Sequence, residues 1–133
     1  MDELSKNDLI NYRIARARET LNEVHSMVEG GYWNGAVNRL YYACYYSVSA
    51  VLLKYDLQAH SHTGVRQMFG LHLVQTKKIS RDLAKFYTDI FDKRQTGDYD
   101  DFISYNKETL DELIPLATQL IEQLELIINT KEA

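Results

Sequence analysis

Arg94, Asp98 and Tyr99 bring a permanent cation, a carboxylate and a phenol together within one short stretch of chain. An arginine presents a planar fork of donors that suits a phosphate or a carboxylate group. A carboxylate can accept a proton and a phenol can donate one. These three residues are therefore the candidate catalytic residues. The alternative is a structural ion pair between Arg94 and Asp98 that holds the end of a helix.

Apolar residues upstream of Arg94 recur at the spacing of an amphipathic helix. They are Leu83, Phe86, Tyr87, Ile90 and Phe91. Arg94 continues this series and therefore lies on the core-facing side of the same helix. A guanidinium that faces inward needs a partner, because an unpaired buried charge is costly, and Asp98 is the nearest one in sequence. Thr96 and Gly97 predict the end of the helix, since glycine enters the left-handed conformation without a steric penalty.

The chain contains ten tyrosines, and four of them crowd into one short segment. These are Tyr41, Tyr42, Tyr45 and Tyr46. Residues four apart share a helix face, so the rings form two adjacent aromatic ridges. Either they pack this helix against its neighbours, or they form a stacking platform or a dimer surface.

A polar pair, Asn38 and Arg39, interrupts the otherwise apolar helix just before these tyrosines. If this helix packs against the one that carries Arg94, Arg39 would bring a second cation to the same place. We therefore expect Arg39, Tyr42 and Arg94 to be the ligand-binding residues.

Histidines offer little sign of a metal centre. Two of the four histidines, His60 and His62, flank Ser61, but no cysteine or acid stands near them at ligand spacing, so no metal ion is expected. We expect His62 to make a hydrogen bond at the start of a helix and His72 to lie in the core. No glycine-rich phosphate loop or catalytic triad is visible, and no cofactor is expected.

Composition indicates one ordinary domain. A chain of 133 residues can bury a single core, and one proline argues against a linker, so residues 1–133 are expected to form one domain. A net charge of −4 argues against a protein that coats nucleic acid by charge alone. The lone Cys44 cannot form an internal disulfide. The chain shows no signal peptide and no membrane-spanning run, so we expect a cytoplasmic protein without membrane contact.

Hydrophobic periodicity predicts helices and no strand. The expected helices cover about residues 6–29, 32–55 and 63–75, a segment from the Ser80 cap to Gly97, and a last one that Asn106 or Ser104 caps. The second is apolar or aromatic almost all round, as in a helix that is central or covered by a second subunit. Pro115 should kink the last helix. The fold class is all-α, a bundle of about five helices.

Two blocks of the sequence together resemble the HEPN domains. The first is Ala36-Val37-Asn38-Arg39-Leu40-Tyr41-Tyr42-Ala43, and the second is Arg94-Gln95-Thr96-Gly97-Asp98-Tyr99. Between them, Ser61-His62-Thr63-Gly64-Val65 and Phe69 are similar to the small stand-alone bacterial and archaeal members. The similarity spans roughly residues 33–102. It implies an antiparallel helical bundle that forms a homodimer, with the polar blocks lining a cleft between subunits.

The resemblance also implies a choice of activities. Many HEPN proteins are metal-independent endoribonucleases that use an arginine and a histidine four to six residues after it. Others are partners of a small nucleotidyltransferase in toxin–antitoxin systems, where AMP is attached to a tyrosine near the motif. The family arginine falls on Arg94, but the histidine positions hold Tyr99, Asp100 and Asp101. Tyr99 is therefore the candidate modification site.

Three hypotheses follow from these residues and the resemblance. The first is a HEPN protein of a toxin–antitoxin-type system that binds the phosphate of a nucleotide or of RNA at a dimer cleft. The second is a non-catalytic structural or interaction bundle. The third is a metal-independent endoribonuclease with a degenerate motif, in which Asp98 or Tyr99 stands in for the histidine. Because that histidine is absent, the sequence leaves open whether the protein is an enzyme.

Overall fold

The computed structural model describes residues 3–100 and 102–130, which form helices and no strand. The elements are α1 (Glu3–Glu29), α2 (Trp33–Lys54), α3 (His62–Phe69), the π-helical turn η1 (Gly70–Val74), α4 (Arg81–Tyr99) and α5 (Lys107–Asn129). The predicted all-α bundle of about five helices is thereby confirmed.

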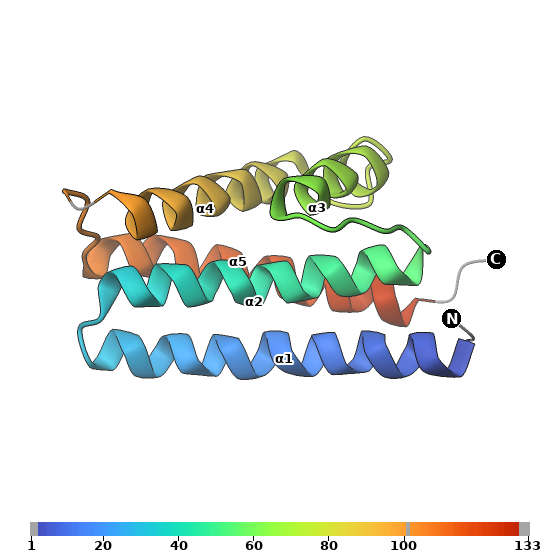
Figure 1. The fold of residues 1–133 in the computed structure, drawn as a ribbon, viewed down its shortest axis with the longest axis horizontal. Coiled ribbons are helices and arrows are strands. Elements are labelled where there is room, and N and C mark those ends of the chain that lie inside the picture. The colour runs from blue at the N-terminus through green and yellow to red at the C-terminus, as the bar shows by residue number, and fades with distance from the viewer. Residues whose placement is uncertain (1–2, 101, 131–133) are drawn as a thin grey trace.

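The long helices run alternately up and down, so α1 is antiparallel to α2 and α4 is antiparallel to α5 (Figure 1). α2 packs against α1, α3, α4 and α5. One end of the bundle carries the α1–α2 turn and the α4–α5 connection (Figure 1). The predicted central position of α2 is confirmed, and cover by a second subunit stays a prediction.

Burial of α2 explains why its sequence is so apolar. Its fully buried side chains include Val37, Leu40, Tyr41, Cys44 and Val48. Each large apolar side chain removed from water contributes about 1.5–3 kcal/mol. Complete burial raises the pKa of the Cys44 thiol far above its usual range. Cys44 therefore acts as a small hydrophobic residue.

The predicted end of α4 at Gly97 is wrong, because the helix continues to Tyr99. Gly97 does not take a positive φ, whereas Gly31, after α1, has a φ of 76°. A Cβ atom at Gly97 would lie 2.9 Å from Cε2 of Tyr105. Glycine therefore serves here to admit the ring of Tyr105, not to turn the chain.

The third predicted helix is divided into α3 and η1, and this division corrects the placement of His72. A π-helical turn takes about one extra residue, so the face that points to the core shifts by one position. Val65, Phe69 and Leu73 are buried, whereas His72 is exposed. The expectation that His72 is a core residue is wrong.

Both helix caps that the sequence indicated are present. The Ser80 hydroxyl accepts from the Leu83 N–H at 3.3 Å, and the Asn106 side chain accepts from the Thr109 N–H at 3.0 Å. Pro115 lies inside an unbroken α5, and its kink stays a prediction. Within the described residues, no helix has the length and apolar character that crossing a membrane requires.

Candidate functional site

The guanidinium of Arg94 is held between α2 and α4. Nη2 donates a hydrogen bond to the Tyr42 hydroxyl at 3.1 Å, and Nε lies 3.5 Å from Oδ2 of Asp98. Cζ stands 5.4 Å from the ring centres of both Tyr41 and Tyr42, within cation–π range. The side chain is 12% exposed. The expected partner, Asp98, is confirmed, and Tyr42 is a second one.

These contacts leave part of the hydrogen-bonding capacity of Arg94 unused. A guanidinium carries five N–H donors. Within residues 3–100 and 102–130, Arg94 forms one side-chain hydrogen bond, to Tyr42. The buried Nε forms no hydrogen bond, although it is ion-paired with Asp98. A partly buried cation with spare donors suits an oxyanion.

Asn38 completes the link between the two sequence blocks. Its Nδ2 donates to Oδ2 of Asp98 at 2.9 Å, the same oxygen that pairs with Arg94. Sequence reasoning noted Asn38 as a polar insertion but gave it no role. The signal was present, because Asn38 and Tyr42 are four residues apart and share one face of α2.

Arg39 makes its contacts elsewhere. Its Nε and Nη2 both donate to Oε2 of Glu23 on α1, at 2.9 and 2.6 Å. The structure does not bring Arg39 into contact with Arg94, Tyr42 or Asp98 among the described residues. Its expected role in ligand binding stays a prediction, and a ligand would have to compete with Glu23.

Tyr99 is the last residue of α4 and is 81% exposed. It makes no described contact with Arg94, so the structure does not join these two candidates. Asp100 accepts from the Phe102 N–H at 2.9 Å, a local turn contact. Asp101 lies outside the described residues. Exposure makes the Tyr99 hydroxyl accessible to another protein.

The expectation that His62 makes a hydrogen bond at the start of a helix is confirmed, but its partner on α2 was not predicted. Nδ1 of His62 is hydrogen-bonded to the Tyr41 hydroxyl at 2.7 Å, and its ring lies 4.6 Å from that of Tyr45. Burial, and then the charge of Arg94, lower the pKa of His62 below its usual value of 6.5. Ser61, not His62, caps α3 by accepting from the Gly64 N–H at 2.9 Å. No spacing in the sequence pairs α3 with α2, so the contact was not predictable.

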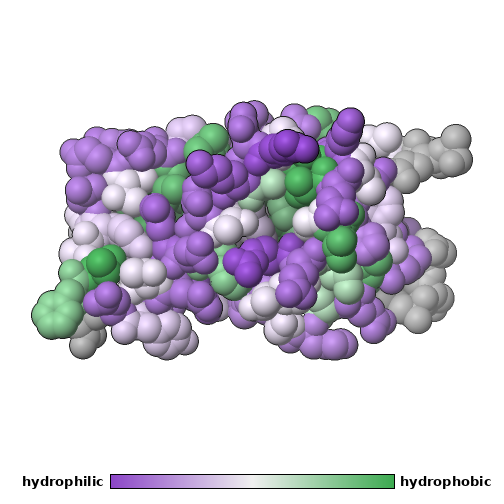
Figure 2. Space-filling model, turned by 90° about the horizontal axis from the view of Figure 1, so that it is seen from above, coloured by the Kyte–Doolittle hydropathy of each residue, from purple (hydrophilic) through white to green (hydrophobic). Residues whose placement is uncertain are grey.

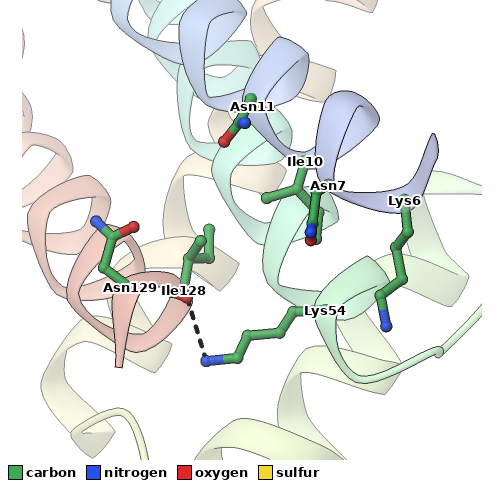
Figure 3. Close-up of a pocket in the computed structure, with 7 residues that line it drawn as sticks. All are labelled: Lys6, Asn7, Ile10, Asn11, Lys54, Ile128 and Asn129. Carbon is green, nitrogen blue, oxygen red and sulfur yellow. Dashed lines mark hydrogen bonds between the residues drawn. The ribbon is translucent and has the colours of Figure 1, made fainter. Parts of the chain in front are cut away.

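A separate groove of about 450 Å³ lies where α1, the end of α2 and the end of α5 meet (Figure 3). Its lining includes Lys6, Lys54 and Asn129. Lys54 donates to the Ile128 carbonyl of α5 at 3.3 Å and to the carbonyl of Thr130, just after α5, at 2.7 Å. Lys6 pairs with Asp56 at 3.3 Å. The cations of this groove are thus engaged in binding helix ends together. Among the described residues, no group of three or more His, Cys, Asp or Glu side chains is placed to hold a metal ion.

Comparison with known proteins gives one family and one fold. Residues 10–127 match the family model described as HEPN domain. A Thermotoga maritima relative named "UPF0332 protein" is 36% identical over 124 residues, which cover 93% of this chain and 94% of the relative. A Methanocaldococcus jannaschii relative named "Putative toxin MJ0142" is 30% identical over 101 residues, 76% of this chain and 69% of the relative. The crystal structure of TT1696 from Thermus thermophilus has a TM-score of 0.77, over 89% of this chain and 97% of that one, at 15% identity.

Proposed function

This chain belongs to the HEPN domain family, and on that basis we propose that it binds the phosphate group of a nucleotide or of RNA at Arg94. We further propose that it acts as a homodimer within a toxin–antitoxin-type pair, whose second member is a small nucleotidyltransferase.

The observation that carries the phosphate proposal is the state of the Arg94 side chain. Tyr42 and Asp98 hold it in one orientation, yet most of its N–H donors have no hydrogen bond among the described residues. A guanidinium that is already oriented loses less entropy when it binds an anion. The motif resemblance also assigns the family arginine to this residue.

Two further observations support a toxin–antitoxin pair. The name of the M. jannaschii relative contains the word toxin. Tyr99 follows the Arg94 site and is 81% exposed, so a transferase could reach its hydroxyl. The test is co-expression with a nucleotidyltransferase encoded beside this chain. A mass gain of one adenylyl group that Tyr99→Phe abolishes supports the proposal, and an unmodified protein contradicts it.

Support for a homodimer comes from aromatic side chains that one copy leaves uncovered. Tyr32 and Phe102 are exposed at the bundle end that carries the α1–α2 turn and the α4–α5 connection (Figure 1). By contrast, hydrophilic residues cover most of the face seen over α3 and α4, where apolar ones show only in small separate areas (Figure 2). Light scattering on the wild type and Phe102→Ser measures the dimer directly, and a monomeric wild type contradicts it.

The phosphate proposal is tested by titrating the protein with AMP and with a short single-stranded RNA. Arg94→Ala should lose binding to both. Arg81→Ala is the matched control, because it removes the same charge from an exposed position at the other end of α4. Equal binding by both variants contradicts a site at Arg94.

A structural role is the second candidate function, favoured by the network of Asn38, Asp98, Arg94 and Tyr42 that ties α2 to α4. It predicts that Arg94→Ala lowers the melting temperature and that the wild type binds neither AMP nor RNA. Thermal melts recorded beside the titrations separate the two candidates.

A further inference from the structure

We propose that His62 is a second ligand-binding residue of the Arg94 site, and that its Nε2–H donates a hydrogen bond to the phosphate that Arg94 holds. The inference rests on the proposed phosphate binding and adds to it a residue from a different helix. The ligand would be a phosphate attached to a nucleoside, either free or within a strand.

The first support is the shared position of the two side chains. Arg94 and His62 come from α4 and α3, yet both contact the rings of Tyr41 and Tyr42. The Arg94 Cζ lies 5.4 Å from each ring centre, and the His62 ring lies 5.7 Å from each. Both groups therefore contact the same pair of rings, and they are near enough for the charge of Arg94 to lower the pKa of His62.

The second support is the hydrogen bond between Tyr41 and His62, in which we infer that Tyr41 is the donor. Tyr41 is fully buried, and burial raises the pKa of its hydroxyl, so this group keeps its proton. A buried O–H needs an acceptor, and the proposal assigns this role to Nδ1 of His62, which lies 2.7 Å away. When Nδ1 accepts, a neutral imidazole carries its proton on Nε2.

The tautomer determines what His62 can do. Its lowered pKa keeps the ring neutral at pH 7, and Nε2 has no hydrogen-bond partner among the described residues. An N–H donor thus stands beside a cation that also has spare donors. Two donors from separate elements suit the several oxygens of one phosphate group better than a single carboxylate.

The tyrosines offer aromatic rings on which the rest of a nucleotide can stack. Tyr42, Tyr45 and Tyr46 are only partly buried, and their rings follow one another along α2 at 6.1 Å from Tyr42 to Tyr45 and from Tyr45 to Tyr46. Aromatic rings beside a phosphate site are surfaces on which bases stack. A nucleoside phosphate therefore fits this site better than inorganic phosphate alone.

The experiment compares AMP, adenosine and a short oligoadenylate as ligands of the wild type, His62→Ala and Arg94→Ala. We expect His62→Ala to weaken AMP binding about tenfold, the usual effect of one lost hydrogen bond. Adenosine, which has no phosphate, should bind the wild type and His62→Ala equally. Tighter binding of the oligoadenylate than of AMP would identify a strand as the ligand, and equal binding a free nucleotide.

His72→Ala is the matched control, because it removes an exposed imidazole from the neighbouring turn η1. Should His62→Ala fail to fold, His62→Gln keeps an acceptor for Tyr41. NMR of the wild type needs no variant. Its ring nitrogens should show the proton on Nε2, and that signal should move when AMP is added but not when adenosine is.

The failures of the two proposals are distinguishable. If Arg94→Ala loses AMP while His62→Ala binds it as the wild type does, Arg94 keeps its role and the inference about His62 is overturned. A proton on Nδ1, or an Nε2 signal that AMP does not move, also overturns it. If the wild type binds neither AMP nor oligoadenylate, the proposed function fails and the inference fails with it.

Discussion

The Tyr42 hydroxyl on α2 accepts a hydrogen bond from Nη2 of Arg94 on α4 at 3.1 Å, although the two residues are 52 positions apart. This contact joins directly the two sequence blocks that resemble HEPN domains. Asn38 and Asp98 form a second link beside it at 2.9 Å. The two blocks therefore form a single polar cluster in an otherwise apolar interface between helices.

Tyr42→Phe should lower the free energy of unfolding by about 1 kcal/mol, because one hydrogen bond to Arg94 is lost while the ring stays in place. Urea denaturation measures the change. Tyr12→Phe serves as the control, since Tyr12 is exposed and should give no difference. Equal midpoints for the two variants would mean that the Tyr42 hydroxyl contributes nothing to stability.

Stability should depend on pH through His62. Burial and the charge of Arg94 lower the pKa of His62 in the folded protein below 6.5, so the unfolded chain takes up the proton first. The contribution of the neutral His62 to the free energy of unfolding is therefore fully present above about pH 6.5 and is lost as the pH falls below it. Urea midpoints at pH 7.5 and 5.5 should differ more for the wild type than for His62→Gln. A larger loss in the variant would contradict the assigned direction.

The purified protein should not cleave RNA in EDTA. In the tautomer that we infer above, the His62 imidazole accepts from Tyr41 at Nδ1, and its other nitrogen carries a proton and is not a base. Tyr99 makes no described contact with Arg94. Gel analysis of labelled RNA provides the measurement. Cleavage that Arg94→Ala removes would instead identify a nuclease.

Substitution by alanine should raise the free energy of unfolding at one glycine and not at another. Gly70 has helical dihedral angles, and a Cβ there would meet no atom within 4 Å, so Gly70→Ala should stabilise by about 0.5–1 kcal/mol. Gly97→Ala should give no such gain, because its Cβ would lie 2.9 Å from the Tyr105 ring. The Tyr105 hydroxyl is bonded to the Lys93 carbonyl at 2.8 Å, which limits how far the ring can move. Thermal melts of both variants test the pair, and equal stabilisation would contradict it.

The sequence predicted well what depends on neighbours along the chain. The helix caps at Ser80 and Asn106 and the pair of Arg94 with Asp98 are all local patterns, and the structure confirms each. The central place of α2 also followed, because a helix that is apolar all round must be covered.

What the sequence did not predict depends on packing between elements. The π-helical turn η1 moves the buried position from His72 to Leu73, and α4 passes through Gly97 because a ring from a later segment fills the space. The contact of His62 with Tyr41 requires α3 to lie against α2. None of these is a spacing that can be counted along the chain.

Because Cys44 is buried, the rate at which its thiol is labelled measures how often the core of this protein opens. The chain has one thiol, and it lies at the centre of the helix that contacts the other α-helices. A thiol reagent in solution can react with it only when α2 becomes exposed, so the labelling rate counts opening events. A ligand that bridges α3 and α4 would slow this rate, and the change would report binding without a labelled ligand.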